Sequence, residues 1–131
     1  ENGQRGAIKY NEESKAKKEN HVFAIESDAG GFSPRGFSID SNDEKFKIIE
    51  KWSIYFKPYL IHYFEKGGSG ADISFLKSKN NVLVGLRPDS QRYFEYHHSE
   101  NDVFSSINKR ELELGAASIA SLVYLVDYFK L

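Results

Sequence analysis

The sequence contains no cysteine and no methionine, and only three prolines and one tryptophan among its 131 residues. Without cysteine the chain can form neither a disulfide framework nor a thiolate metal site, so any bound metal must be held by histidine, aspartate and glutamate. Such a set of nitrogen and oxygen ligands suits zinc or another divalent cation. Because the chain has no cysteine, its cysteine usage does not indicate whether the protein works in an oxidising or a reducing compartment.

A strong net charge and long apolar runs are absent as well. The formal charge is −1, so no global electrostatic field favours nucleic acid or an anionic membrane as a partner. No stretch has the apolar length needed to cross a bilayer, and no signal-peptide pattern is visible. Apolar residues at 40% and charged residues at 28% are ordinary for one globular domain, whereas the aromatic share of 15% is high.

Helical and strand patterns alternate along the chain. The expected elements are a helix at 3–19, a strand at 21–26, a short strand at 37–40, a helix from 42 or 43 to about 56, a strand at 59–64, a strand at 81–86 and a helix at 108–129. Pro58 is expected to stop or kink the second helix, because it lacks a backbone donor. This alternation favours an α/β sandwich with a largely parallel sheet.

The last helix is expected to pack on the sheet. Its apolar face is predicted to consist of Leu112, Ile119, Leu122, Val123, Val126 and Phe129. Three alanines, Ala116, Ala117 and Ala120, are expected to let the helix approach the sheet closely.

Residues of metal-ligand type follow the ends of strands. Asp28 comes directly after a buried strand, and His97 and His98 lie in a loop beyond the next clear strand. If a strand also ends just before Glu1, all of these residues meet at one edge of the sheet, where α/β folds build their sites.

Each residue also has a simpler interpretation. Asp28 either caps the backbone of the Gly30-Gly31 loop that follows it or binds a metal. Of the histidine pair, one ring can face a metal while the other packs beside it, although exposed histidine pairs are common. Asp102 either orients the ligating ring or caps the following turn.

Four motifs in this order resemble those of a known family. They are residues 1–6 (ENGQRG), 26–37 (ESDAGGFSPRGF), 67–73 (GGSGADI) and 96–99 (YHHS). Over essentially its whole length the chain is similar to the C-terminal half of the catalytic domain of the di-zinc exopeptidases related to aminopeptidase Y and plasma glutamate carboxypeptidase. The resemblance implies a three-layer α/β sandwich with a mostly parallel or mixed sheet, the zinc-exopeptidase (phosphorylase/hydrolase-like) fold, present in part.

The resemblance also implies roles for single residues. Glu1 matches a zinc ligand, and the general-base glutamate of the family is expected immediately before it. Asp28 matches the carboxylate ligand of the other zinc, and His98 matches the histidine that shares a zinc with Glu1. His97 is the weaker match. Two zinc ions would activate a water that attacks the peptide carbonyl, and the remaining ligands would come from upstream sequence.

Substrate-binding residues are expected around these ligands. Gly68, Gly70 and Asp72 are expected to shape one wall of the pocket, with Asp72 better suited to capping than to catalysis. An apolar side-chain pocket is expected to include Phe32, Phe75 and Tyr93.

Two functions from different classes follow. In the first, residues 1–131 are part of a zinc-dependent aminopeptidase or dipeptidase that hydrolyses peptides, and the isolated chain is inactive because the base and some ligands lie upstream. In the second, the chain is a non-catalytic remnant of the same fold that acts as a binding module. The family suggests a secreted or periplasmic protein.

A domain divided through its sheet exposes an unpaired strand edge and apolar surface. We therefore expect the 131-residue chain to self-associate through that edge or to pair with the N-terminal half of the domain. Size-exclusion chromatography measures this, and a compact soluble monomer would contradict the expectation.

Overall fold

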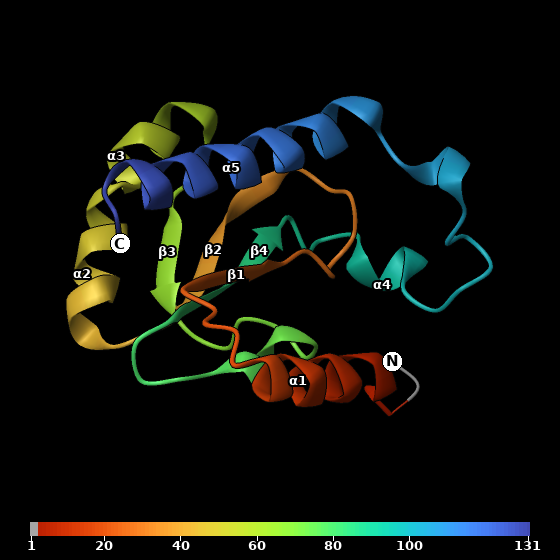
Figure 1. Ribbon diagram of the computed structural model, residues 1–131. Helices are drawn as coiled ribbons and strands as arrows, with labels where there is room; N and C mark the ends of the chain where they lie inside the picture. The colour runs from red at the N-terminus through yellow and green to blue at the C-terminus, as the bar shows by residue number, and fades with distance from the viewer. Residues whose placement is uncertain (1–2) are drawn as a thin grey trace.

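The protein, described here by a computed structural model of residues 3–131, is a four-stranded sheet between helices. The helices in this range are α1 (Arg5–Lys17), α2 (Asp43–Lys51), α3 (Ser53–Phe56), α4 (Tyr93–Tyr96) and α5 (Lys109–Tyr128), with the 3-10 helices η1 (Lys57–Tyr59), η2 (Ile73–Leu76) and η3 (Phe104–Ser106). The strands are β1 (Phe23–Glu26), β2 (Pro34–Asp40), β3 (Tyr63–Lys66) and β4 (Val82–Pro88). Figure 1 shows three layers, with α5 on one side of the sheet and α1 on the other.

The strands lie in the order β1-β4-β2-β3. β1 pairs with β4 and β2 pairs with β3 in parallel, whereas the central β2–β4 pair is antiparallel. The expected three-layer α/β fold with a mixed, mostly parallel sheet is therefore confirmed. The carboxyl ends of the parallel strands β1 and β4 lie at the same edge of the sheet. The segments that follow the two strands therefore start side by side.

The main core lies between the sheet and α5. Alternate residues of β2, such as Phe37 and Ile39, are almost completely buried on this face, and Leu122 of α5 packs against them. The ring of Phe37 meets those of Phe56 and Phe64 edge-on, with centroids 5.7 and 5.5 Å apart. Each such side chain contributes about 1.5–3 kcal/mol by leaving water, so this face anchors the sheet.

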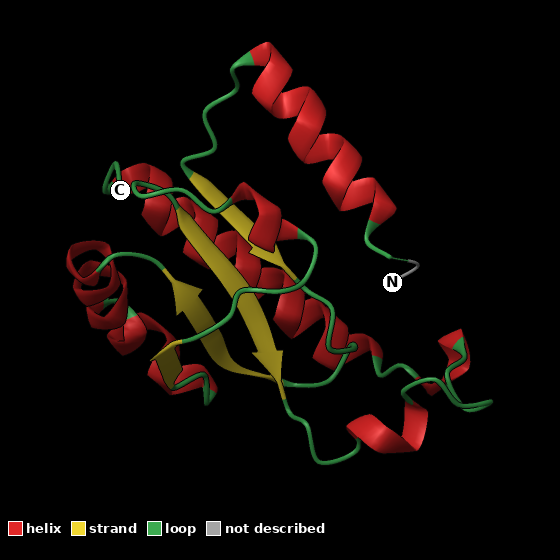
Figure 2. Ribbon diagram, turned by 90° about the horizontal axis from the view of Figure 1, so that it is seen from below, coloured by secondary structure: helices red, strands yellow, loops and turns green. Residues whose placement is uncertain are grey.

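The opposite face of the sheet is only partly covered. Strand side chains alternate between faces, so Ser38, Tyr63, Glu65 and Arg87 project away from the α5 core. Figure 2, viewed from that side, shows α1 along the β1 side of the sheet while β2, β3 and much of β4 remain in view. This exposed face is the one that carries polar residues.

The region after β2 departs from the expected pattern. Asn42 caps α2, since its side chain accepts a hydrogen bond from the Lys45 backbone N–H at 2.9 Å, but the expected single helix divides at Trp52 into α2 and α3. Pro58 lies in η1, and Leu60 then reverses the chain with φ 61°. The expected strand at 59–64 is therefore wrong at its start: β3 begins at Tyr63.

The last helix forms where expected, with Asn108 as its cap. The prediction that three alanines face the sheet is wrong, because Ala116, Ala117 and Ala120 are exposed. The small residues that allow close packing are Gly115 and Ser118, which are buried. Among the described residues, no helix combines the length and the apolarity that a membrane crossing requires.

The β2–β3 pairing requires glycine at position 36. Gly36 faces Tyr63 in the register, and a Cβ at this position would overlap the Tyr63 carbonyl oxygen. We expect Gly36→Ala to lower the free energy of unfolding by about 3 kcal/mol, since backbone must move to relieve the overlap. Urea denaturation measures the change.

Gly6→Ala is the matched control, because a Cβ at Gly6 meets nothing within 4 Å and the residue lies in α1. This variant should be stabilised by about 0.5–1 kcal/mol, the helix-propensity difference. Equal stability of the two variants would rule out the steric argument.

Candidate active site at the ends of β1 and β4

Asp28 and His98 lie about 70 residues apart in sequence but line the same cavity. Asp28 follows β1 directly, and His98 follows α4, which itself comes after β4. Because β1 and β4 are parallel neighbours, the segments after them meet at one edge of the sheet. We call this space of about 260 Å³ the histidine cavity.

The two histidines have different environments in the histidine cavity. The ring of His97 stacks on Tyr93, with centroids 4.5 Å apart and planes 22° from parallel. It also lies 4.0 Å from the ring of His98. His97 therefore packs as part of an aromatic wall beside His98, and both histidines line the cavity.

His98 adopts an uncommon backbone conformation. Its φ of 56° lies in the left-handed region, which few residues other than glycine and asparagine adopt without cost. Such conformations persist where the surrounding structure imposes them, often at functional sites.

A second space, the glycine-loop cavity, has a volume of about 240 Å³ and shares Asp28 and Tyr93 with the first. Gly68 and Gly70 line it as well, so three of the expected substrate-binding residues lie next to Asp28. Asp72 lines neither cavity. It holds the N-cap position of η2, although its side chain makes no capping hydrogen bond.

The loop that follows β3, residues 67–73, is called the glycine loop below. It is fixed in place by Glu26, the last residue of β1. Its carboxylate accepts hydrogen bonds from the backbone N–H groups of Ala71, Asp72 and Ile73 at 3.1, 3.0 and 3.1 Å. Gly70 has φ 142°, and a Cβ there would overlap the Glu26 carboxylate. Charged acceptors make strong hydrogen bonds, so this one side chain joins the end of β1 to the loop after β3.

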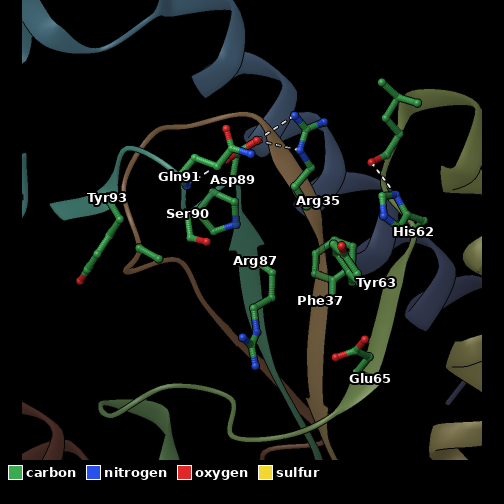
Figure 3. A pocket seen from close by; sticks show the side chains of 13 residues that line it. Arg35, Phe37, His62, Tyr63, Glu65, Arg87, Asp89, Ser90, Gln91 and Tyr93 are labelled. Atoms are coloured by element: carbon green, nitrogen blue, oxygen red, sulfur yellow. Dashed lines mark hydrogen bonds and ion pairs between the residues drawn. The ribbon is translucent and has the colours of Figure 1, made fainter. Parts of the chain in front are cut away.

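A third and larger space, the sheet cavity, has a volume of about 740 Å³ and lies against the exposed face of the sheet. Figure 3 shows Arg35 paired with Asp89 at its rim, with Nη2–Oδ2 at 2.9 Å. The Gln91 backbone N–H, and then Arg35, hold the pKa of Asp89 below its usual value. Arg87 and Tyr93 line both this cavity and the glycine-loop cavity, which makes them a shared wall.

The donors at this edge fit part of a zinc site. Asp28 supplies a carboxylate and His98 an imidazole, the ligand types that zinc accepts. Within residues 3–131 no group of three or more such side chains is arranged to hold a metal ion. The third expected ligand, Glu1, lies outside the described residues, so two donors in one cavity are what the described chain contributes.

The sequence interpretation missed Glu26 and Arg87. Glu26 belongs to the motif that contains Asp28, but a glutamate at a strand end gives no signal for three backbone partners 45–47 residues away. Arg87 was treated only as part of a strand-ending turn. Its exposure could not be inferred from a period-2 pattern, because β4 is buried without interruption from Val82 to Leu86.

Comparison with known proteins gives consistent relatives. No protein-family model matches the chain. It is 30% identical over 126 residues to carboxypeptidase Q of Bos taurus and 29% identical to that of Homo sapiens, in both cases covering 96% of this chain. It also superimposes on the crystal structure of a peptidase M28 precursor from Shewanella amazonensis with a TM-score of 0.80 and 27% identity, over 95% of this chain.

These matches show that the chain is similar to one part of the carboxypeptidase Q proteins and of a peptidase M28 precursor. They confirm the resemblance to exopeptidases that was drawn from the four motifs. The chain spans about 27% of the length of these curated relatives and 28% of the solved structure.

The Glu26 contact can be tested by Glu26→Gln. Glutamine keeps the shape but offers one acceptor oxygen and adds an N–H₂ group that faces backbone donors. We expect a loss of about 1–3 kcal/mol of unfolding free energy, and faster hydrogen exchange of the Ala71, Asp72 and Ile73 amides. Urea denaturation and NMR exchange measure the two effects.

Glu65→Gln serves as its control, since Glu65 is exposed on β3 and makes no hydrogen bond or ion pair with any other described residue. It should leave both observables unchanged. Unchanged hydrogen exchange of the Ala71, Asp72 and Ile73 amides in Glu26→Gln would refute the role of Glu26 in fixing the glycine loop.

Proposed function

We propose that residues 1–131 form the part of a zinc-dependent exopeptidase domain that supplies Asp28 and His98 as metal ligands. The observation that carries this proposal is the meeting of these two residues in the histidine cavity. Homology to carboxypeptidase Q and peptidase M28 supports the class of reaction, hydrolysis of a peptide bond near a chain end. The remaining ligands and the general base then belong to the preceding part of the domain.

The proposed site divides its tasks among the residues of this chain. Asp28 would hold one zinc ion, and His98 would hold the other together with Glu1. Two zinc ions, when bound, would supply an activated water and polarise the carbonyl group. The ring of His97 packs on Tyr93 and lies beside that of His98 without being assigned to a metal. The glycine loop, positioned by Glu26, forms the adjacent wall for the peptide.

Asp28 is well placed for a role in positioning substrate as well. It lines both the histidine cavity and the glycine-loop cavity, so a metal on Asp28 would lie at their junction. A peptide whose carbonyl group reaches that junction can extend one end into each cavity. This arrangement suits an exopeptidase, since each cavity is small.

The proposal is tested by His98→Asn in the polypeptide that includes the upstream segment. Asparagine tolerates the left-handed conformation of residue 98, so stability should change by less than about 0.5 kcal/mol. Bound zinc, measured by atomic absorption, should fall, and peptidase activity should drop at least about 100-fold because a ligand is lost. Asp28→Asn should act in the same way.

His97→Asn is the control, and it should retain zinc because its ring packs on Tyr93. The 131-residue chain alone, with zinc added, should not hydrolyse dipeptides or aminoacyl substrates. Turnover by the isolated chain would contradict its assignment as part of a domain. A wild-type polypeptide that binds no zinc and cleaves no peptide would favour a non-catalytic binding module.

A further inference from the structure

We propose that Glu111, the third residue of α5, is a positioning residue that holds the loop carrying Asp28 and the segment carrying His98 at a fixed spacing. This inference deepens the proposed function and rests on it for the roles of Asp28 and His98. Glu111 lines none of the three cavities at this edge of the sheet. It therefore acts through the residues that it contacts.

Three segments that are distant in sequence form the walls of the histidine cavity. They are the loop after β1, the short helix α4 with the two residues that follow it, and the stretch that leads into α5, which supply lining residues within 28–32, 93–98 and 102–108. Figures 1 and 2 show α4 and the stretch between α4 and α5 beyond the edge of the sheet. Contacts other than strand pairing must therefore set the distance between Asp28 and His98.

Neither of the segments that carry Asp28 and His98 is rigid by itself. The Asp28 loop, residues 27–33, contains two adjacent glycines, and Gly30 has φ 87°, so backbone preference alone leaves it many conformations. The helix α4 is a single turn without a side-chain cap, and helices of this length are not stable in isolation. Both segments depend on side-chain contacts for their position.

The Glu111 carboxylate reaches both segments. Its Oε1 atom accepts a hydrogen bond from the Ser33 hydroxyl at 2.7 Å. Its Oε2 atom lies 3.4 Å from Nη2 of Arg92, the residue at the N-cap position of α4. Ser33 ends the Asp28 loop, and Arg92 begins the segment that leads to His98. One carboxylate thus joins the two segments to α5.

Ring contacts extend this connection to the wall of the histidine cavity. The Arg92 guanidinium lies over the Phe32 ring, with Cζ 5.2 Å from the ring centroid. The Phe32 ring in turn packs against that of Tyr96, with centroids 5.6 Å apart. Both rings line the cavity. A guanidinium group is attracted to an aromatic face, so Glu111, by binding Arg92, also holds two rings of the cavity wall.

Glu111 is a fixed point because α5 itself is fixed. The Asn108 side chain caps the helix by accepting a hydrogen bond from the Glu111 backbone N–H at 3.1 Å. Further along the helix, Leu122 is buried in the main core. A carboxylate in the first turn is also favoured by the helix dipole. The core therefore holds the carboxylate, and the carboxylate holds the two segments.

The two contacts of Glu111 differ in strength. The hydrogen bond from Ser33 is short, and its charged acceptor belongs to a side chain that is only 24% exposed, which makes this contact the stronger one. The Arg92 side chain is 49% exposed, and ion pairs at such exposure contribute little by themselves. Loss of the Ser33 contact should therefore disturb Asp28 more than loss of the Arg92 contact.

The zinc affinity of the polypeptide that includes the upstream segment tests this role. Glu111→Ala removes both contacts and should weaken zinc binding about 10-fold, as judged by competition with a chromophoric chelator. The same variant should lower kcat and leave KM nearly unchanged, because Glu111 does not line the cavities that would receive the peptide. Glu111→Gln, which keeps an acceptor oxygen for Ser33, should recover part of the zinc affinity.

Glu113→Ala is the matched control. It removes a glutamate from the same helix, where Glu113 is exposed and pairs with Lys109, and it should leave zinc affinity and kcat unchanged. Urea denaturation is measured on both variants. A Glu111→Ala protein that loses stability but binds zinc as tightly as the wild type would show a purely structural role and would overturn the proposal.

A double-mutant cycle isolates the connection through Glu111. Ser33→Ala should weaken zinc binding more than Arg92→Gln does. In the Glu111→Ala background, Ser33→Ala should have no further effect, because its partner is already absent. An undiminished effect of Ser33→Ala in that background would show that Ser33 acts independently of Glu111 and would refute the connection.

An experiment without zinc separates this inference from the proposed reaction. In the 131-residue chain, NMR measures the NOE between the Phe32 and Tyr96 rings, whose centroids lie 5.6 Å apart. A second NOE joins Gly31 to Ile107, since a Cβ on Gly31 would lie 3.1 Å from the Ile107 Cγ2. Both contacts cross between segments that line the histidine cavity.

Both NOEs should weaken in Glu111→Ala and persist in Glu113→Ala. Ser33→Ala, which leaves α5 and its cap unchanged, provides the same comparison in a second variant. Weakened NOEs would support the positioning role even if the polypeptide with its upstream segment binds no zinc. Unchanged NOEs in both Glu111→Ala and Ser33→Ala would overturn it.

Discussion

The Glu26 carboxylate determines where the glycine loop lies relative to the end of β1. One side chain at the end of β1 accepts three hydrogen bonds from a loop 45–47 residues further along the chain. Because Asp28 follows Glu26 by two residues, the same strand end fixes both the loop and the candidate ligand. The loop is further joined to β2, since the Ser38 hydroxyl donates to the Gly68 carbonyl oxygen at 2.7 Å. The position of the glycine-loop cavity is therefore set by strand ends rather than by the flexibility of glycine.

The mixed sheet gives the site its two different sides. Parallel β1 and β4 bring Asp28 and the segment containing His98 to one edge. The antiparallel β2 then starts at that edge, and Arg35 near its beginning pairs with Asp89 after the end of β4. The side with Asp28 and His98 and the side with the Arg35–Asp89 pair consequently arise from different strand pairings. Tyr93 lines all three cavities.

Much of this could be predicted from local patterns, and the failures have identifiable causes. The buried strands β1 and β4 and the helices α1 and α5 follow from apolar periodicity, and the short-range motifs led to Asp28 and His98. The start of β3 was misplaced because β-forming residues around Tyr59 suggested a strand, while Pro58 and the left-handed Leu60 impose a turn. The contact face of α5 was misassigned because composition favoured its alanines, whereas packing selected Gly115 and Ser118. The role of Glu26 is non-local, so no window of sequence contains its partners.

The parallel pairing of β1 with β4 also has a consequence for how the protein folds. Phe23 pairs with Val82, so this contact closes a loop of about 60 residues and loses chain entropy before other native contacts compensate for it. Side chains that meet only through this pairing are brought together late, when the topology is complete. Any ligand that bridges Asp28 and His98 would act as a non-covalent cross-link across that loop, and it would shift the equilibrium toward the closed sheet by mass action. Folding of the domain and binding of a ligand at its site are therefore thermodynamically coupled.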